Sequence, residues 1–456
     1  MNALISLSVL GIVAMLSEIF NFKKFLYSLI LLGLVAAIGV NVMEWGQFQL
    51  WYGMMIVDEF TLAFSGVILL TGFLWFLLVA DNHQDKAHIS DHFAISLFAM
   101  AGAIVMVSYN NLSMLFLGIE IVSISMYIMA STQKNDLGSN EAGFKYFLMG
   151  AFATGFILFG TALLYGATAT FDIQKIGVFV TEHNSELPAI FYAGLILIMV
   201  GMAFKISAVP FHWWAPDVYT GSPTLITAFM ATIVKTAAFA AFLRLFITCF
   251  SGVELFWNQT IMIMAGATIL LGNITALLQN DFKRILAFSS VAHAGYMLLA
   301  VLAMNNQSGG SLLFYLLAYS ISSLSAFAVL LAVANLKGNT NVQSFKGLAK
   351  KNPFLAFVVI VAMLSLAGIP PTAGFFAKYY IFTAAIANNY VGLTLVAITG
   401  SIVSIFYYFR IVIVMFEGDE STEVTVGSNT KALLVICSVL VILLGLMPDF
   451  LIGLLK

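Results

Sequence analysis

Apolar runs of about twenty residues follow one another along almost the whole chain, and short polar segments separate them. An α-helix rises about 1.5 Å per residue, so about 20 apolar residues cross the hydrocarbon core of a bilayer. The pattern therefore predicts an all-α polytopic membrane protein with about fourteen transmembrane helices. The predicted helices run near residues 2–20, 25–43, 59–80, 91–108, 111–132, 144–168, 188–220, 223–249, 257–278, 283–303, 311–336, 353–385, 391–416 and 430–452.

The seventh and twelfth predicted helices are too long for one simple span, and each contains proline near its middle. Pro210 lies in the string AVPFH, and Pro370 and Pro371 lie in GIPPTAG, which ends with Gly374. Because proline removes a backbone donor and clashes with the preceding turn, we expect both helices to be broken at membrane depth. A packing kink would explain one break alone. Two breaks, each within about two turns of a lysine, favour a cavity in which the freed carbonyl groups find water or protein partners.

The two broken helices are five helices apart, which predicts an internal repeat. Five is an odd number, so a repeated unit of five helices inserts its second copy upside down. Inverted repeats with discontinuous helices are typical of transporters. We therefore predict two inverted five-helix repeats, helices 4–8 and 9–13. The chain would then divide into residues 1–108 with the first four helices, 109–250 with the rest of the first half-channel, 251–420 with the second half-channel, and 421–456 with the last helix.

The composition agrees with a chain surrounded by lipid. Of the 456 residues, 61% are hydrophobic and 9% are charged, whereas about a quarter are charged in soluble proteins. The net charge of −2 provides no basic surface, so we expect no nucleic-acid partner. Cys249 and Cys437 lie far apart in apolar runs, so we expect neither a disulfide framework nor a metal cluster. The first apolar run lacks a basic n-region and a small-residue cleavage site, which favours a retained helix over a signal peptide.

Basic residues predict the orientation of the helices, because cytoplasmic loops collect lysine and arginine. If both termini face outward, the outward connections hold only Lys175 and Lys456. The inward connections then hold Lys23, Lys24, Lys86, Lys134, Lys145, Lys283, Arg284, Lys337, Lys346, Lys350, Lys351 and Lys431. We therefore predict a multi-pass protein of the bacterial inner (plasma) membrane with both termini on the periplasmic side.

Five titratable residues are predicted deep in the membrane, where a charge costs about 2.5–3.5 kcal/mol on insertion scales. Glu120 lies about 14 Å into its helix, Lys235 about 18 Å and His293 about 15 Å. Lys205 precedes the first break, and Lys378 follows the second. Residues placed at this cost usually have a function, so we treat the five as a candidate site.

Such a row of groups can relay protons. At about 5 Å and an effective dielectric constant of 20, Coulomb coupling is about 3 kcal/mol, so one charge can switch the protonation of the next. A Glu120–Lys205 pair that forms and breaks would alternately hold and release the proton on Lys235. The alternative is a static lock of ion pairs, for which one carboxylate facing three lysines and a histidine is poorly balanced. His293 can also be read as a core residue bonded to nearby serines. Arg244 and Arg410 lie near helix ends, and we expect them to snorkel to the interface.

Three strings carry a family resemblance: FKISAVPFHWWAPDVYTGSPTLITAFMATIVKTAAF, NDFKRILAFSSVAHAGYM and LAGIPPTAGFFAKYYIF. They resemble the subunit N family of complex I, the NADH–quinone oxidoreductase, and the resemblance covers nearly the whole chain. It implies an antiporter-like, proton-translocating subunit of the membrane arm, whose partners are other membrane-arm subunits, including other antiporter-like subunits. It also implies that NADH, flavin, Fe–S clusters and quinone are bound by partner subunits, with no cofactor or metal in this chain.

The resemblance also implies roles for the five residues. Glu120 would be the fifth-helix glutamate that pairs with Lys205 of the seventh helix. Lys235 would be the central eighth-helix lysine, and Lys378 the twelfth-helix lysine on the side where protons leave. His293 would be a tenth-helix bridge between the half-channels, with ordered water completing the path.

Two other classes of function compete with this one. A stand-alone or Mrp-type cation/proton antiporter would share the broken helices, but sodium sites usually need several carboxylates and backbone oxygens. Among the 21 acidic residues, only Glu120 is predicted deep in the membrane, apart from Glu18 near a helix end. A purely structural subunit would not require the buried charges. The electron donor is not encoded here, so a ferredoxin-dependent or photosynthetic-type complex stays open.

Overall fold

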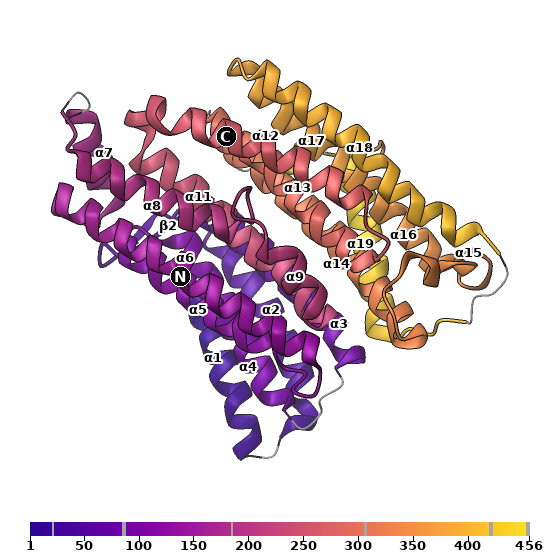
Figure 1. Cartoon of the computed structure of the whole chain (residues 1–456). Helices are drawn as coiled ribbons and strands as arrows, with labels where there is room; N and C mark the ends of the chain where they lie inside the picture. The colour runs from indigo at the N-terminus through magenta and orange to yellow at the C-terminus, as the bar shows by residue number, and fades with distance from the viewer. Residues whose placement is uncertain (21, 84–87, 184–185, 305–307, 419–422, 453–456) are drawn as a thin grey trace. The chain divides into compact units, whose positions relative to one another are not determined.

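A computed structural model describes residues 1–20, 22–83, 88–183, 186–304, 308–418 and 423–452. Figure 1 shows that the described chain is nearly all helical. Its one sheet in these ranges is an antiparallel hairpin of β1 (Gln49–Trp51) and β2 (Met55–Val57), in which Leu50 is paired with Ile56. Lys86 and Lys456, which entered the topology prediction, lie outside the described residues.

Twelve helical segments of the described chain are long and apolar enough to cross a membrane. Eight of them are α1 (Asn2–Ile19), α2 (Lys23–Met43), α3 (Glu59–Asn82), α4 (Ile89–Ser108), α5 (Leu112–Ala130), α6 (Leu137–Thr168), α13 (Phe282–Ala303) and α14 (Ser308–Lys337). The other four are α10 (Thr224–Phe229) continued through the π-helix η1 (Met230–Val234) into α11 (Lys235–Cys249), η2 (Ser251–Val253) continued into α12 (Glu254–Leu277), α18 (Val391–Phe416) and α19 (Ser428–Leu446). The shorter helices α7 (Ile173–Glu182), η3 (Val342–Phe345), α15 (Leu348–Lys351) and α20 (Asp449–Ile452) lie between or after these spans.

Two further apolar segments are interrupted. The seventh consists of α8 (Ala189–Lys205) and α9 (Trp214–Gly221), and the twelfth of α16 (Pro353–Ala367) and α17 (Ala373–Ala387). With the twelve continuous spans they make up the predicted fourteen, so the predicted fold class and both broken helices are confirmed. The predicted prolines lie in the gaps, whereas Gly374 is the second residue of α17.

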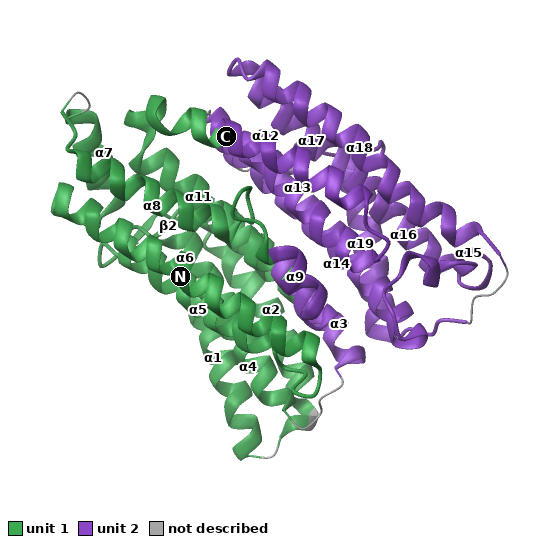
Figure 2. Ribbon diagram, viewed as in Figure 1, with its two compact units in different colours: residues 1–73, 84–214, 233–261 green, residues 74–83, 215–232, 262–456 purple. Residues whose placement is uncertain are grey.

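The described chain forms two compact units, coloured separately in Figure 2. Unit 1 contains residues 1–73, 84–214 and 233–261, and unit 2 contains residues 74–83, 215–232 and 262–456. In unit 1, α6 packs along α8, and α4 packs against α1 and α5. In unit 2, α14 packs against α16, α17 and α19, and α13 packs against α17 and α18. The predicted half-channel boundaries at residues 108, 250 and 420 stay a prediction.

The surface of the helices explains why the chain needs a membrane. α6 exposes Phe147 and Phe152 at 50% and 74% of their surfaces. By contrast, α13 and α14 are buried throughout their apolar windows. Large exposed aromatic side chains are unfavourable in water, so these outer faces suit contact with lipid.

Helix ends in the two units share one connection pattern, which supports the predicted five-helix repeat. Asn111 precedes α5, the fifth span, and forms a β-bridge with Asp172 beyond α6. Asp281 precedes α13, the tenth span, and forms a β-bridge with Asn341 beyond α14. The side chains of Asn111 and Asp281 both cap their helices. Each bridge follows the end of its second helix by four residues, since Thr168 ends α6 and Lys337 ends α14.

Candidate proton relay

The first group of predicted residues lies in unit 1, beside the first helix break. Lys205 is the last residue of α8, and its Nζ donates a hydrogen bond of 2.8 Å to Ser123 Oγ on α5. Glu120 is half-buried one turn earlier on α5 and attracts Lys205 electrostatically. The ion pairs found among the described residues do not include one between Glu120 and Lys205. The structure therefore brings the two predicted partners into one neighbourhood, with the ammonium on Ser123.

The break itself explains why Lys205 has a defined place. The last carbonyls of a helix lack partners within it, and Trp214 Nε1 donates to one of them, the Phe204 oxygen, at 3.0 Å. The Trp214 ring also stacks on Tyr146 of α6, with ring centroids 4.7 Å apart. A positive charge is favourable at the carboxyl end of a helix, which is where Lys205 lies.

Lys235 is the first residue of α11 and is 2% exposed. The five residues before it form the π-helix η1. A π-helix inserts an irregular turn into an α-helix and is frequent at functional sites. The sequence analysis missed this feature, because TAFMATIVKTAAF reads as one regular apolar helix.

His293 lies in unit 2, and its imidazole is fixed from both sides. Nδ1 is 2.7 Å from Tyr315 Oη on α14, and Nε2 is 3.2 Å from Tyr408 Oη on α18. A neutral imidazole has one donor and one acceptor nitrogen, so it can accept a proton on one side and release one on the other. These two partners of the ring are tyrosine hydroxyls, whereas the alternative interpretation of His293 as an ordinary core residue had predicted hydrogen bonds to nearby serines.

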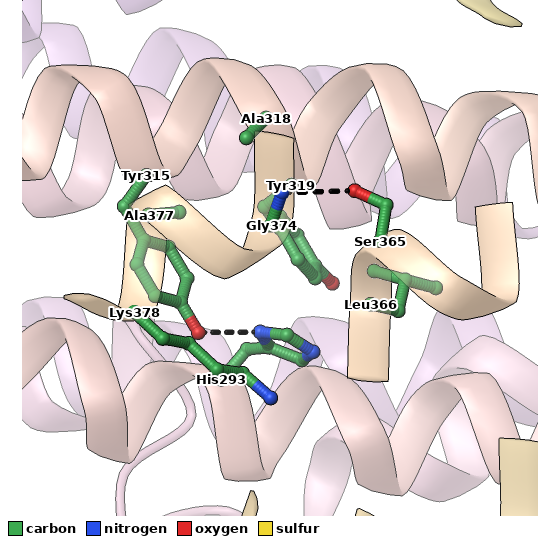
Figure 3. A pocket seen from close by; sticks show the side chains of 9 residues that line it. All are labelled: His293, Tyr315, Ala318, Tyr319, Ser365, Leu366, Gly374, Ala377 and Lys378. Atoms are coloured by element: carbon green, nitrogen blue, oxygen red, sulfur yellow. Dashed lines mark hydrogen bonds between the residues drawn. The ribbon is translucent and has the colours of Figure 1, made fainter. Parts of the chain in front are cut away.

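The second break forms a small pocket around His293 (Figure 3). The pocket is lined by His293, Tyr315, Ala318, Tyr319, Ser365, Leu366, Gly374, Ala377 and Lys378. Gly374 N donates to Ser365 Oγ at 3.2 Å, drawn as a dashed line in Figure 3. A Cβ atom at Gly374 would lie 1.7 Å from the Ser365 carbonyl oxygen, so this close approach of α17 to α16 requires glycine.

Lys378 uses the second break directly. Its Nζ donates to the carbonyl oxygen of Ala367, the last residue of α16, at 2.7 Å, and to Ser401 Oγ at 2.9 Å. Because the helix is interrupted here, the Ala367 carbonyl has no partner within α16, and the Lys378 ammonium donates a hydrogen bond to it. Lys378 is 5% exposed, and both of these acceptors are neutral.

A set of hydroxyl and amide groups extends from His293, and the sequence analysis missed it. The ring of Tyr408 packs against that of Tyr407, with ring centroids 4.5 Å apart. Tyr407 Oη donates to Asn273 Oδ1 at 3.0 Å, and Asn273 Nδ2 donates to Tyr296 Oη at 3.0 Å. The Lys378 ammonium lies 5.1 Å from the centre of the Tyr296 ring. A buried tyrosine hydroxyl usually has a hydrogen-bond partner. The tyrosines within the apolar helices could therefore have indicated this set of polar groups from the sequence.

Arg244 contradicts the expectation that it snorkels. It is 6% exposed, and its guanidinium donates to Asp58 Oδ1 at 2.7 Å and to Thr61 Oγ1 at 3.0 Å. Asp58 precedes α3, and although burial raises its pKa, the charge and hydrogen bond of Arg244 outweigh burial and lower the pKa below its usual value. The ion pair joins the hairpin end of unit 1 to α11. Arg410 donates to the carbonyl oxygen of Gln279.

The structure thus groups Glu120, Lys205 and Lys235 in unit 1, and His293 and Lys378 in unit 2. Within the described ranges, no group of three or more His, Cys, Asp and Glu side chains could hold a metal ion.

Comparisons with known proteins point to one family. Residues 109–404 match the family described as NADH:quinone oxidoreductase/Mrp antiporter, TM. The chain is 44% identical to NADH-quinone oxidoreductase subunit N of Cytophaga hutchinsonii, over 99% of this chain and 98% of that protein. A chain of respiratory complex I from Thermus thermophilus is similar in structure, with a TM-score of 0.85, 33% identity and coverage of 99% and 98% of the two chains. A chain of an archaeal membrane-bound sulfane sulfur reductase has the same fold, with a TM-score of 0.88, 23% identity and coverage of 100% and 96%.

Proposed function

This chain belongs to the family of membrane subunits shared by NADH:quinone oxidoreductases and Mrp antiporters, and from that premise we propose that a row of buried side chains moves protons through it. The chain is a multi-pass, proton-translocating membrane-arm subunit of an NADH–quinone oxidoreductase, complex I, and thus part of a translocase. The proposed relay consists of Glu120, Lys205, Lys235, His293 and Lys378, with ordered water between them.

One observation carries the relay: a lysine stands at each helix break and is bonded to neutral acceptors. Lys205 donates to a serine hydroxyl, and Lys378 donates to a serine hydroxyl and a carbonyl. An ammonium in a buried site is expensive unless a charge pairs with it, so an ammonium held by neutral groups can release its proton more readily than one in an ion pair. This supports a relay over a static lock of ion pairs.

The proposed path has two arms. In unit 1 the proton passes from Glu120 and Lys205 to Lys235. In unit 2 it passes from His293 to Lys378, on the side where protons leave. Two hydroxyl groups on the His293 ring support its role as a bridge, because they give each nitrogen a partner for proton exchange.

The energy for this movement would come from elsewhere in the complex. We propose that partner subunits bind NADH, flavin, Fe–S clusters and quinone, and that other antiporter-like subunits adjoin this chain. The complex would lie in a bacterial inner membrane with both termini of this chain outside. The 44% identity to an NADH-quinone oxidoreductase subunit favours this assembly over a Mrp-type cation/proton antiporter.

Substitution of Lys235 tests the proposed function in the intact complex. Lys235→Met should leave the complex assembled but lower NADH-driven proton pumping, and the electron transfer coupled to it, by about tenfold or more, because a positioned proton-transfer group contributes roughly 10²–10⁴-fold to a rate. Lys235→Arg distinguishes a proton relay from a static lock of ion pairs, since arginine keeps the charge but does not deprotonate in proteins. A static lock tolerates arginine, whereas a relay does not. Normal pumping by Lys235→Arg, measured in membrane vesicles, would exclude the relay.

A further inference from the structure

Ser123 is the residue on which the Lys205 ammonium is found, although the sequence pointed only to Glu120. The Lys205 bond to Ser123 Oγ is 2.8 Å long, and Ser123 is 3% exposed. The hydroxyl proton of Ser123 is directed to the carbonyl oxygen of Ile119 on the same helix. Because its own proton is engaged there, the oxygen faces Lys205 as an acceptor only. The geometry therefore makes Ser123 Oγ a defined hydrogen-bond acceptor for Lys205 Nζ.

Glu120 and Ser123 offer Lys205 two different positions on one helix face. They are three residues apart on α5, and residues at this spacing are neighbours on the surface of a helix. Lysine carries its ammonium on a flexible four-carbon chain, so a change of rotamer can move it between the two. A carboxylate stabilises the ammonium by charge, whereas a hydroxyl provides only a neutral hydrogen bond. The two positions thus hold the proton on Lys205 with different strength.

The internal repeat provides independent support for Ser123. Ser123 lies twelve residues after the bridge residue Asn111, and His293 lies twelve residues after the equivalent Asp281. The same helical position therefore carries a relay residue in each unit: a titratable histidine in one, and in the other a hydroxyl that holds a titratable lysine.

The partner helices correspond as well. Lys205 lies five residues before Pro210, and Ser365 lies five residues before Pro370. Ser365 lines the pocket that also contains His293. In unit 1 the residue before the break, Lys205, is hydrogen-bonded to Ser123, and in unit 2 the residue before the break, Ser365, lines one pocket with His293.

From these observations we propose that Ser123 is a positioning residue, the second partner of Lys205, which holds the ammonium away from Glu120 so that its proton can pass on. In this position Lys205 gives one proton to the next acceptor and becomes a neutral amine, while Ser123 keeps its hydroxyl proton and donates it in a hydrogen bond to the Ile119 carbonyl oxygen. Return to Glu120 accompanies reprotonation. The inference rests on the proposed function, since it concerns how one member of the relay releases its proton.

The test compares Ser123→Ala, Ser123→Thr and Lys205→Met in the assembled complex, with Ser125→Ala as the matched control. Ser125 is buried on the same helix and donates to the Ile121 carbonyl just as Ser123 donates to Ile119. The measurements are NADH-driven proton pumping in membrane vesicles and the pH profile of the coupled electron transfer. A merely structural role for Ser123 would not move the pH profile.

We expect Ser123→Ala to lower pumping several-fold and to shift the profile to higher pH, because Glu120 then keeps the proton on Lys205. Ser123→Thr retains the hydroxyl and should restore both, and Ser125→Ala should match the wild type. If Ser123→Ala matches Ser125→Ala while Lys205→Met loses pumping, the inference is overturned and the relay stands. If Lys205→Met pumps normally, the proposed function itself fails. Should Ser123→Ala not assemble, Ser123→Cys, a weak acceptor of similar size, replaces it, and a wild-type profile there overturns the inference.

Discussion

The helix pair α5–α6 of unit 1 and the helix pair α13–α14 of unit 2 have the same backbone connections but different chemistry. Both pairs are closed by a β-bridge between equivalent polar residues. The first presents a carboxylate and a serine to a lysine at the helix break. The second presents a histidine and several tyrosines, and its lysine lies beyond the break. The internal repeat therefore preserves the positions of polar groups on these helices. The titratable group lies on the helix before the break in unit 1, as Lys205, and on the bridged helix pair in unit 2, as His293.

This difference predicts that proton transfer in unit 2 depends on Lys378 more than proton transfer in unit 1 depends on any single hydroxyl group. Lys378 Nζ donates to the Ala367 carbonyl oxygen and to Ser401 Oγ, so its removal takes the titratable group away from both neutral acceptors. Lys378→Met should lower proton pumping by about tenfold or more, the effect of losing a proton-transfer group. Lys431, an exposed lysine near the start of α19, offers the control, and Lys431→Met should pump normally. Equal activity of the two variants would remove Lys378 from the relay.

A methyl group at Gly374 should distort the pocket of unit 2 without touching unit 1. The added Cβ meets backbone 1.7 Å away, so α17 must shift relative to α16. Forced overpacking typically costs about 1–3 kcal/mol, and we expect Gly374→Ala to reduce pumping several-fold with a lower thermal stability of the complex. Gly392→Ala is the control, because no atom lies within 4 Å of a Cβ there. Unchanged pumping and stability for Gly374→Ala would show that the close approach is not required.

The two tyrosines on His293 should matter unequally. Tyr315 is hydrogen-bonded to the ring at 2.7 Å and Tyr408 at 3.2 Å. A single hydrogen bond contributes about 0.5–1.5 kcal/mol, so Tyr315→Phe should slow pumping about two- to tenfold, and Tyr408→Phe should slow it less. Steady-state pumping rates of the two variants, at equal amounts of assembled complex, give the order. The reverse order would mean that the shorter bond only orients the ring.

Much of this architecture was predictable from the chain alone, because its main signals are local. Span lengths and the prolines at 210, 370 and 371 predicted fourteen helices with two interruptions. Lys205, Lys235 and Lys378 could be selected as candidates from the sequence because a charge in an apolar run is conspicuous in hydropathy.

The partners of these groups were not predictable, because they come from distant parts of the chain. Ser123 is 82 residues from Lys205, Tyr408 is 115 residues from His293, and Asp58 is 186 residues from Arg244. Tyrosine and serine hardly change the apolar pattern, so nothing local indicated them. The π-helix before Lys235 was missed for a related reason, since backbone irregularity without proline or glycine has no compositional signal.

The surroundings of α13 also bear on how the protein is made. The hydroxyl partners of His293 belong to α14 and α18, which follow α13 in the chain and are therefore synthesised after it. A polar residue without partners is costly in lipid, so newly inserted α13 is less stable in the bilayer until those later helices pack around it. The His293 ring therefore acquires its two hydroxyl partners only after α14 and α18 have been synthesised and have packed against α13.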